Sequence, residues 1–224
     1  MARATIRKKG YWLTLLGVAA VGLIALPLLA APAEPTVRLN NAFSSAGSGV
    51  GESSLGDLVA DAMRTATGAQ VALLDSEALR EMDLPKGVVK VSQFQNALSD
   101  ARDPLAIITL SGKVLARALD RSVSNLPQPS PGFLQVAGVT FDVNAAGSGR
   151  PHASGVRVDG KPLDMGAQYS VAVTRALARG TNGYFLVWPA STPSRDIGQT
   201  LGGALTAYLN AHPTITPTSG RIVG

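Results

Sequence analysis

Apolar residues are distributed unevenly along this 224-residue chain, and their distribution limits how the chain can fold. Residues 11–31 form one long, predominantly apolar run. After Glu52 the apolar residues recur in short groups separated by Gly, Ser, Asp and Pro. Short groups at helical and strand spacings are typical of a folded domain, whereas a long run is typical of a segment that enters lipid. We therefore expect three parts: residues 1–33, 34–51 and 52–224.

Residues 1–33 have the organisation of a secretory segment. Basic residues between Arg3 and Lys9 precede the apolar run, and Ala31-Pro32-Ala33 offers a cleavage point. As a helix, the run is about 30 Å long, enough to cross a bilayer. A cleaved signal peptide and a membrane anchor through residues 11–31 therefore both remain open. The basic flank argues against a buried core helix. Either form predicts an extracytoplasmic location, in the periplasm or cell envelope or secreted.

Residues 34–51 are rich in Gly, Ser, Asn and Pro, and we interpret them as a linker. The net charge of +5 arises largely from the N-terminal segment, which holds four basic and no acidic residues. Sixteen basic and 15 acidic residues remain outside it. Such a balance does not provide the basic surface that nucleic-acid binding needs, so we expect no nucleic-acid partner.

Residues 52–224 alternate irregularly between helical and strand patterns. Helices are predicted over 53–67, 92–98, 111–124 and 197–209, and strands over 70–74, 87–91, 105–110, 133–136, 139–143, 155–158, 169–174 and 221–223. Because these elements do not follow a regular βαβ order, we expect an α+β domain in which helices pack on a mixed sheet.

Residues suited to autonomous catalysis are scarce. The chain has no cysteine, which excludes disulfides, thiolate nucleophiles and Cys-ligated zinc. Its two histidines, His152 and His212, each adjoin a proline and have no neighbour at metal-ligand spacing, so a two-metal hydrolase site cannot be assembled. No serine lies in a nucleophile-elbow pattern. We predict no catalytic residues, no metal site and no cofactor.

Several segments nevertheless match one family in order. They are ESSLGDLVADAMR (52–64), VALLDSEALR (71–80), ITLSGKVLARALDRSVS (108–124), GFLQVAGVTFDV (132–143), VDGKPLD (158–164), YSVAVT (169–174), GTNGY (180–184) and GRI (220–222). Together they resemble the C-terminal, nucleotide-recognising domain of the 5'-nucleotidases, without the metallophosphoesterase domain. The resemblance spans essentially residues 52–224.

The resemblance implies a site. In the family two aromatic rings hold the base, and by position they correspond to Phe133 and Tyr184. Arg80 corresponds to an arginine that contacts phosphate, and a guanidinium fork suits that anion. Asp75 and Asn182 complete the implied nucleotide-binding set. Each residue also has a structural alternative: the rings as core residues, Arg80 as a surface ion-pair partner and Asp75 as a helix cap.

The departures from the family pattern concentrate on the phosphate side. Asp75 replaces an asparagine, Glu77-Ala78 replaces Gly-Gly, and Asn182 replaces an aspartate. Ser54 stands where many members have Arg or Asn, and SDARDP (99–104) replaces a Pro-Phe-Gly-Asn stretch. These changes make the site more acidic and predict weakened or altered binding.

Two functions follow from these residues. The first is recognition of a nucleoside or nucleotide, with a separately encoded metallophosphoesterase as partner. The second is a degenerate structural or interaction module of a cell-envelope complex. An autonomous nucleotidase is disfavoured because the metal ligands are missing.

Overall fold

The computed structural model describes Met1, residues 33–144 and residues 149–224. The chain divides into two units, Met1–Ala33 and Glu34–Gly224. The expected signal or anchor run at 11–31 lies outside the described residues. None of the described helices combines the length and apolar character needed to traverse a bilayer.

A five-stranded sheet forms the centre of the Glu34–Gly224 unit, with strand order β12-β6-β11-β3-β7. Its strands are β3 (Val71–Asp75), β6 (Pro104–Ser111), β7 (Leu134–Ala137), β11 (Gln168–Thr174) and β12 (Ser194–Thr200). Strand β11 runs parallel to β3, and the other neighbouring pairs are antiparallel. The mixed sheet and its helices confirm the predicted α+β class.

Both faces of the central sheet are buried. Along β3, Val71 and Leu73 join one apolar cluster, whereas Ala72 and Leu74 join another. Successive side chains of a strand point to opposite faces, so each face has its own core. The first face, which carries Ala72 and Leu74, packs on α1 (Ser54–Thr67), α2 (Val91–Gln95) and α5 (Leu201–Ala211). The second packs on α3 (Gly112–Val123), α4 (Arg175–Ala178) and a second sheet.

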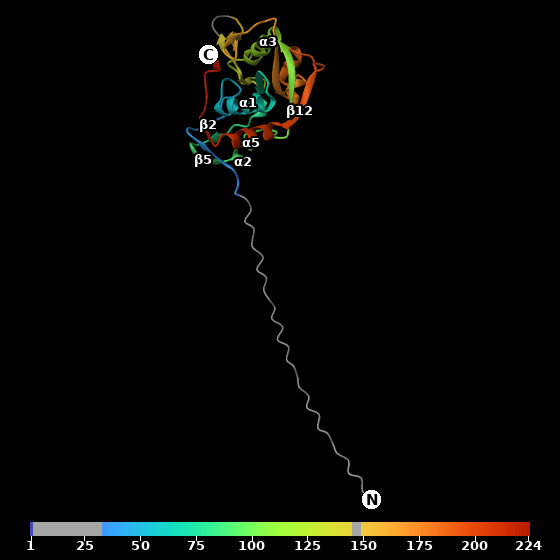
Figure 1. The fold of residues 1–224 in the computed structure, drawn as a ribbon. Coiled ribbons are helices and arrows are strands. Elements are labelled where there is room, and N and C mark those ends of the chain that lie inside the picture. The colour runs from blue at the N-terminus through green and yellow to red at the C-terminus, as the bar shows by residue number, and fades with distance from the viewer. Residues whose placement is uncertain (2–32, 145–148) are drawn as a thin grey trace. The chain divides into compact units, whose positions relative to one another are not determined.

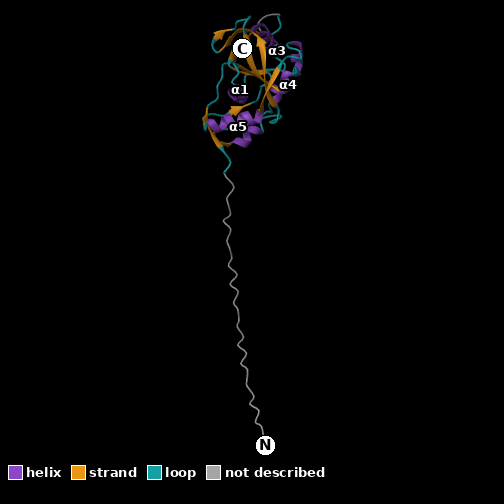
Figure 2. Cartoon of the chain, turned by 45° about the vertical axis from the view of Figure 1, so that its right-hand side comes forward, coloured by secondary structure: helices purple, strands orange, loops and turns teal. Residues whose placement is uncertain are grey.

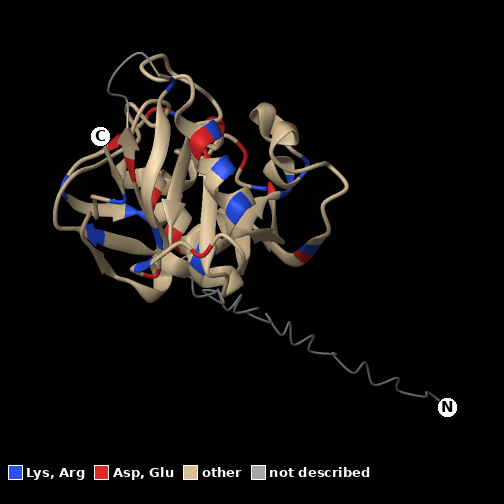
Figure 3. Cartoon of the chain, turned by 90° about the horizontal axis from the view of Figure 1, so that it is seen from above, with Lys and Arg blue, Asp and Glu red and all other residues tan. Residues whose placement is uncertain are grey.

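The second sheet has the order β10-β9-β8-β14. It consists of β8 (Val139–Asn144), β9 (His152–Val158), β10 (Lys161–Pro162) and β14 (Ile222–Val223). Within the Glu34–Gly224 unit, α3 lies at one end and α2 and α5 lie at the other (Figure 1). The turned view keeps α3 and α5 at opposite ends (Figure 2). Basic and acidic residues are interspersed over the surface seen in Figure 3.

The expected linker over residues 34–51 is in fact part of the folded unit. Strand β1 (Thr36–Leu39) pairs with β5 (Gly87–Lys90) and β13 (Thr214–Ile215), and β2 (Phe43–Ser44) pairs with β4 (Asp83–Leu84). Val37 and Leu39 are each 1% exposed, because their side chains alternate inward along β1. Two inward-facing residues are too few for a strand to be recognised from periodicity, which is why the sequence predicts a linker. Because β1 and β2 are paired, the folded unit begins near Glu34 rather than near Glu52.

The last helix also begins later than predicted. Residues 197–200 belong to β12, and α5 starts at Leu201. Two local features stop the helix from extending back. Gly198 has a φ of +69°, outside the helical region, and the hydroxyl of Thr200 accepts a hydrogen bond from the Gly203 N–H at 3.1 Å as the N-cap.

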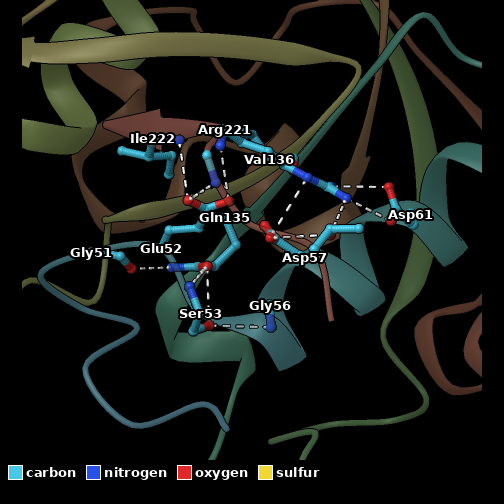
Figure 4. Close-up of polar contacts among 12 residues, drawn as sticks. Gly51, Glu52, Ser53, Gly56, Asp57, Asp61, Gln135, Val136, Arg221 and Ile222 are labelled. Carbon is cyan, nitrogen blue, oxygen red and sulfur yellow. Dashed lines mark hydrogen bonds and ion pairs between the residues drawn. The ribbon is translucent and has the colours of Figure 1, made fainter. Parts of the chain in front are cut away.

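The closing Gly-Arg-Ile segment is attached to α1 by a network of charges (Figure 4). The Arg221 guanidinium donates to both carboxylate oxygens of Asp61, at 3.0 and 2.7 Å, and to the Val136 carbonyl at 2.7 Å. The Glu52 carboxylate accepts from the backbone N–H groups of Gly220 and Arg221, at 2.8 and 3.0 Å. These contacts hold the C-terminal segment against α1 and β7, where the terminal strand β14 lies beside β8.

Asp57 lies at the centre of this network and is fully buried. Its Oδ2 lies 3.6 Å from the Arg221 Nε, while its Oδ1 has no hydrogen-bond partner. Burial raises the pKa of Asp57 from 3.8 to about 8, against the opposing charge of Arg221 and with a further rise from the carboxyl of Glu52. Asp57 is therefore mainly protonated at neutral pH.

Candidate ligand cleft

A cleft of about 160 Å³ opens at one edge of the central sheet. Asp75 ends β3 and Thr174 ends β11, and these two strands are parallel. Asp103 immediately precedes β6, which is antiparallel to β11, so all three residues reach the same edge. The cleft is lined by Asp75, Glu77, Ala78, Ser99, Asp100, Asp103, Thr174, Ala176, Thr181 and Leu201.

The lining is acidic. It includes four carboxylates, Asp75, Glu77, Asp100 and Asp103, and no lysine or arginine. Burial raises the pKa of Asp75 from 3.8 to about 6; the Asn182 hydrogen bond opposes this rise and the charge of Glu77 adds to it. Burial also raises the pKa of Asp103, against a hydrogen bond from Thr174. The cleft therefore presents hydrogen-bond acceptors and negative charge.

Asp75 and Asn182, which the sequence predicts as site residues, lie in direct contact. The Asn182 Nδ2 donates to the Asp75 Oδ2 at 2.6 Å. Asn182 has a φ of +55°, a conformation that asparagine tolerates better than most residues, and Gly183 follows at +85°. The Asn182 carbonyl accepts from the Arg121 Nη2 at 2.8 Å, which fixes the turn. The turn in η2 (Thr181–Leu186) thus holds the amide against the carboxylate.

Arg80 lies beside the cleft rather than in its lining. Its backbone N–H donates to the Ala97 carbonyl at 2.8 Å, and its Nη2 donates to the Ser99 carbonyl at 3.1 Å. Its side chain is exposed, and no ion pair with Glu77 or Glu81 forms among the described residues. Arg80 therefore positions Ser99 at the rim, and its expected role as a phosphate contact stays a prediction.

The open two-ring slot expected from Phe133 and Tyr184 does not form. Phe133 is 1% exposed and Tyr184 is fully buried, and both belong to the apolar cluster on the second face of the sheet. The Tyr184 ring stacks on Trp188 with centroids 5.0 Å apart, and its hydroxyl donates to the Gly132 carbonyl at 2.7 Å. Both rings are thus core residues in this structure, and the Tyr184 ring and hydroxyl already contact Trp188 and Gly132.

Phe133 lines a different hollow, of about 730 Å³, together with Leu126, Pro127 and Ile222. This hollow is larger and more apolar than the acidic cleft. Its lining residues Val143 and Gly149 adjoin residues 145–148, which the structure does not describe. The cleft is therefore the candidate site for a ligand, since it contains Asp75, to which Asn182 is hydrogen-bonded.

Of the ten residues that line the cleft, only Asp75 belongs to the predicted set of site residues; those outside the set include Asp100, Asp103, Thr174 and Thr181. The segment SDARDP (99–104) carries the signal for two of them, since it departs from the family pattern by adding carboxylates. Thr174 and Thr181 carry no such signal in the sequence. Among the described residues, no group of three or more histidine, aspartate or glutamate side chains is placed to hold a metal ion.

Comparison with known protein families shows which family this chain belongs to. The family model described as "5'-nucleotidase, C-terminal domain" matches residues 31–188, well over half of the chain. The chain belongs to the 5'-nucleotidase C-terminal domain family. This family membership confirms the resemblance carried by the sequence segments, and it accounts for the α+β fold.

Individual relatives of this C-terminal domain are considerably longer proteins. The trifunctional nucleotide phosphoesterase protein YfkN of Bacillus subtilis (strain 168) is 26% identical over 149 residues, which cover 62% of this chain and 10% of YfkN. The 5'-nucleotidase precursor of Thermus thermophilus has a TM-score of 0.74 and 26% identity, over 84% of this chain and 38% of its own.

The NAD nucleotidase of Haemophilus influenzae has a TM-score of 0.69 over 83% of this chain and 37% of its own. Its 16% identity supports the fold alone. The 5'-nucleotidase C-terminal domain described here thus spans about a tenth to two fifths of the length of these relatives.

Proposed function

We propose that this chain is an exported recognition domain that binds the nucleoside part of nucleotide-like ligands in the acidic cleft and discriminates against their phosphates. The observation that carries the proposal is the set of four carboxylates in the lining of the cleft, in a domain of the 5'-nucleotidase family. The proposal replaces ring stacking by hydrogen bonding as the source of recognition.

The chemistry of the lining favours a donor-rich ligand without negative charge. Ionised carboxylates only accept hydrogen bonds, so they suit ribose hydroxyls and exocyclic amines. A phosphate dianion about 6 Å from one carboxylate is repelled by about 1.4 kcal/mol even at the dielectric constant of water, which is about tenfold in affinity. Ala78, Ala176 and Leu201 add the apolar lining that a base requires.

Export and partnership complete the proposal. The basic and apolar residues of 1–33 support an extracytoplasmic location, with residues 11–31 as signal peptide or membrane anchor. Because the relatives carry a further half or more of their length beyond this domain, a separately encoded metallophosphoesterase is the partner we propose for nucleotide catabolism.

Calorimetric titration of the full chain with adenosine and AMP tests this function. We expect adenosine to bind at least about tenfold more tightly than AMP, because the repulsion between one carboxylate and the phosphate already corresponds to about tenfold in affinity. Absence of binding by both ligands at millimolar concentration, or tighter binding of AMP, contradicts the proposal.

A second candidate, an interaction module of the cell envelope, is favoured by one observation. Phe185 and Leu186, directly after the buried Tyr184, are 63% and 65% exposed. Large apolar side chains that adjoin one another on a surface mark interaction sites more often than isolated ones do.

A further inference from the structure

One surface of the folded unit combines exposed apolar side chains with unpaired cations, and we call it the α3–η2 surface. Its apolar members are Met165, Phe185 and Leu186, which are 57%, 63% and 65% exposed. Its cations are Lys113 and Arg117 of α3, together with Arg179, all exposed.

Hydrogen bonds connect the segments that carry these six residues. The Lys113 N–H donates to the Met165 carbonyl at 3.1 Å, and Arg117 follows Lys113 one turn later on α3. The Arg117 Nη2 donates to the Leu186 carbonyl at 2.7 Å. The Phe185 N–H donates to the carbonyl of Gly180, next to Arg179. The surface therefore continues from Met165 across α3 to η2.

The cations of this surface lack acidic partners within the described residues. None of Lys113, Arg117 and Arg179 forms an ion pair there, in contrast to Arg64, Arg175 and Arg221. The adjacent carboxylate, Asp164, accepts from the Gly166 N–H at 2.9 Å. Apolar side chains surrounded by unpaired cations complement a surface with the reverse charge.

We propose that the α3–η2 surface docks a partner protein that presents an acidic rim around an apolar centre. A protein fits better than a lipid surface because Phe, Met and Arg are enriched at protein interfaces, and Phe185, Met165, Arg117 and Arg179 supply these residue types. Within the folded unit, α3 lies at the end opposite β5, α2 and α5 (Figure 1). The proposal does not depend on ligand binding in the acidic cleft.

Site-specific photocrosslinking tests the docking in the envelope of the native host. The chain has no cysteine, so a single benzophenone-maleimide can be placed at Leu186→Cys or Met165→Cys, with Val88→Cys as the matched control. Val88 is 61% exposed and belongs to β5, at the other end of the unit. We expect one discrete protein adduct from positions 186 and 165 and none from 88, with acidic residues flanking the crosslinked peptide.

Charge reversal separates docking from accidental contact. Lys113→Glu with Arg179→Glu is expected to reduce the adduct about tenfold or more, because like charges across an interface are strongly unfavourable. These two side chains make no described hydrogen bond, so the variant should keep the melting temperature of the parent. An adduct with lipid or with a second copy of the chain, an adduct insensitive to charge reversal, or no adduct beyond the Val88 control overturns the proposal.

Discussion

The buried carboxyl of Asp57 provides a quantitative test of the network that attaches the C-terminus to α1. Its pKa is about 8 in the folded protein against an ordinary value of 3.8, so the folded state holds a proton that the unfolded state has released. Stability then falls as pH rises between these two values. Replacing Asp57 by Asn keeps the shape of the side chain and removes the titration.

The magnitude follows from the two pKa values. Each pH unit between them corresponds to about 1.4 kcal/mol. Because both pH 5 and pH 7 lie between 3.8 and 8, the stability of Asp57→Asn relative to the parent should increase by about 3 kcal/mol from pH 5 to pH 7. Any constant difference between a carboxamide and a protonated carboxyl cancels from this comparison.

Urea unfolding of the full chain in a non-ionic detergent measures this change. Curves for parent and variant are recorded at pH 5, 6, 7 and 9 and at constant ionic strength. We expect the unfolding free energy of the variant minus that of the parent to rise steadily to pH 7 and to level off at the highest pH. If the unfolding free energy of the variant minus that of the parent stays constant or falls from pH 5 to pH 7, the assignment of a raised pKa to Asp57 is refuted.

Three further substitutions probe the turn and the cleft. Tyr184→Phe leaves the buried Gly132 carbonyl without its donor and should lower the unfolding free energy by about 1–3 kcal/mol; an unchanged value would show that the hydroxyl bond is unimportant. Gly183→Ala places a Cβ 2.4 Å from the Arg121 Nη2, at a residue whose φ is +85°. It should lower the unfolding free energy by more than about 1 kcal/mol. Gly51→Ala, which has open space at its Cβ, is the control. Asn182→Gly keeps the turn and removes the bond to Asp75, so an NMR titration should show the pKa of Asp75 raised above about 6; a lowered pKa contradicts the contact.

The sequence predicts the central elements well because their patterns are long. The apolar run of β3 and the helical stripe of α1 leave little ambiguity, and a serine caps the helix: the Ser53 hydroxyl accepts from the Gly56 N–H at 3.2 Å. Strands of two to four residues, such as β1 and β2, are stabilised by partners distant in sequence. Their pairing with β5, β13 and β4 cannot be found from local periodicity.

Prediction of the candidate site is limited in the same way, because local sequence does not reveal contacts between distant segments. The family pattern assigns Asp75 and Asn182 to one site, and the two side chains are hydrogen-bonded to each other; their contact with a nucleotide stays a prediction. It does not indicate the burial of Tyr184, because an aromatic residue that stacks on Trp188 and one that stacks on a base have the same local sequence. Side-chain burial depends on the packing of distant segments.

The central claim is that the acidic lining of the cleft selects against phosphate. Affinity measurements on a cleft with two fewer carboxylates test it most directly. Asp75→Asn with Glu77→Gly returns two positions to the family pattern and removes two carboxylates from the lining. Calorimetry should show AMP affinity rising by about a hundredfold relative to adenosine, about tenfold for each carboxylate removed. An unchanged ratio of the two affinities would contradict the conclusion that the acidic lining selects against phosphate.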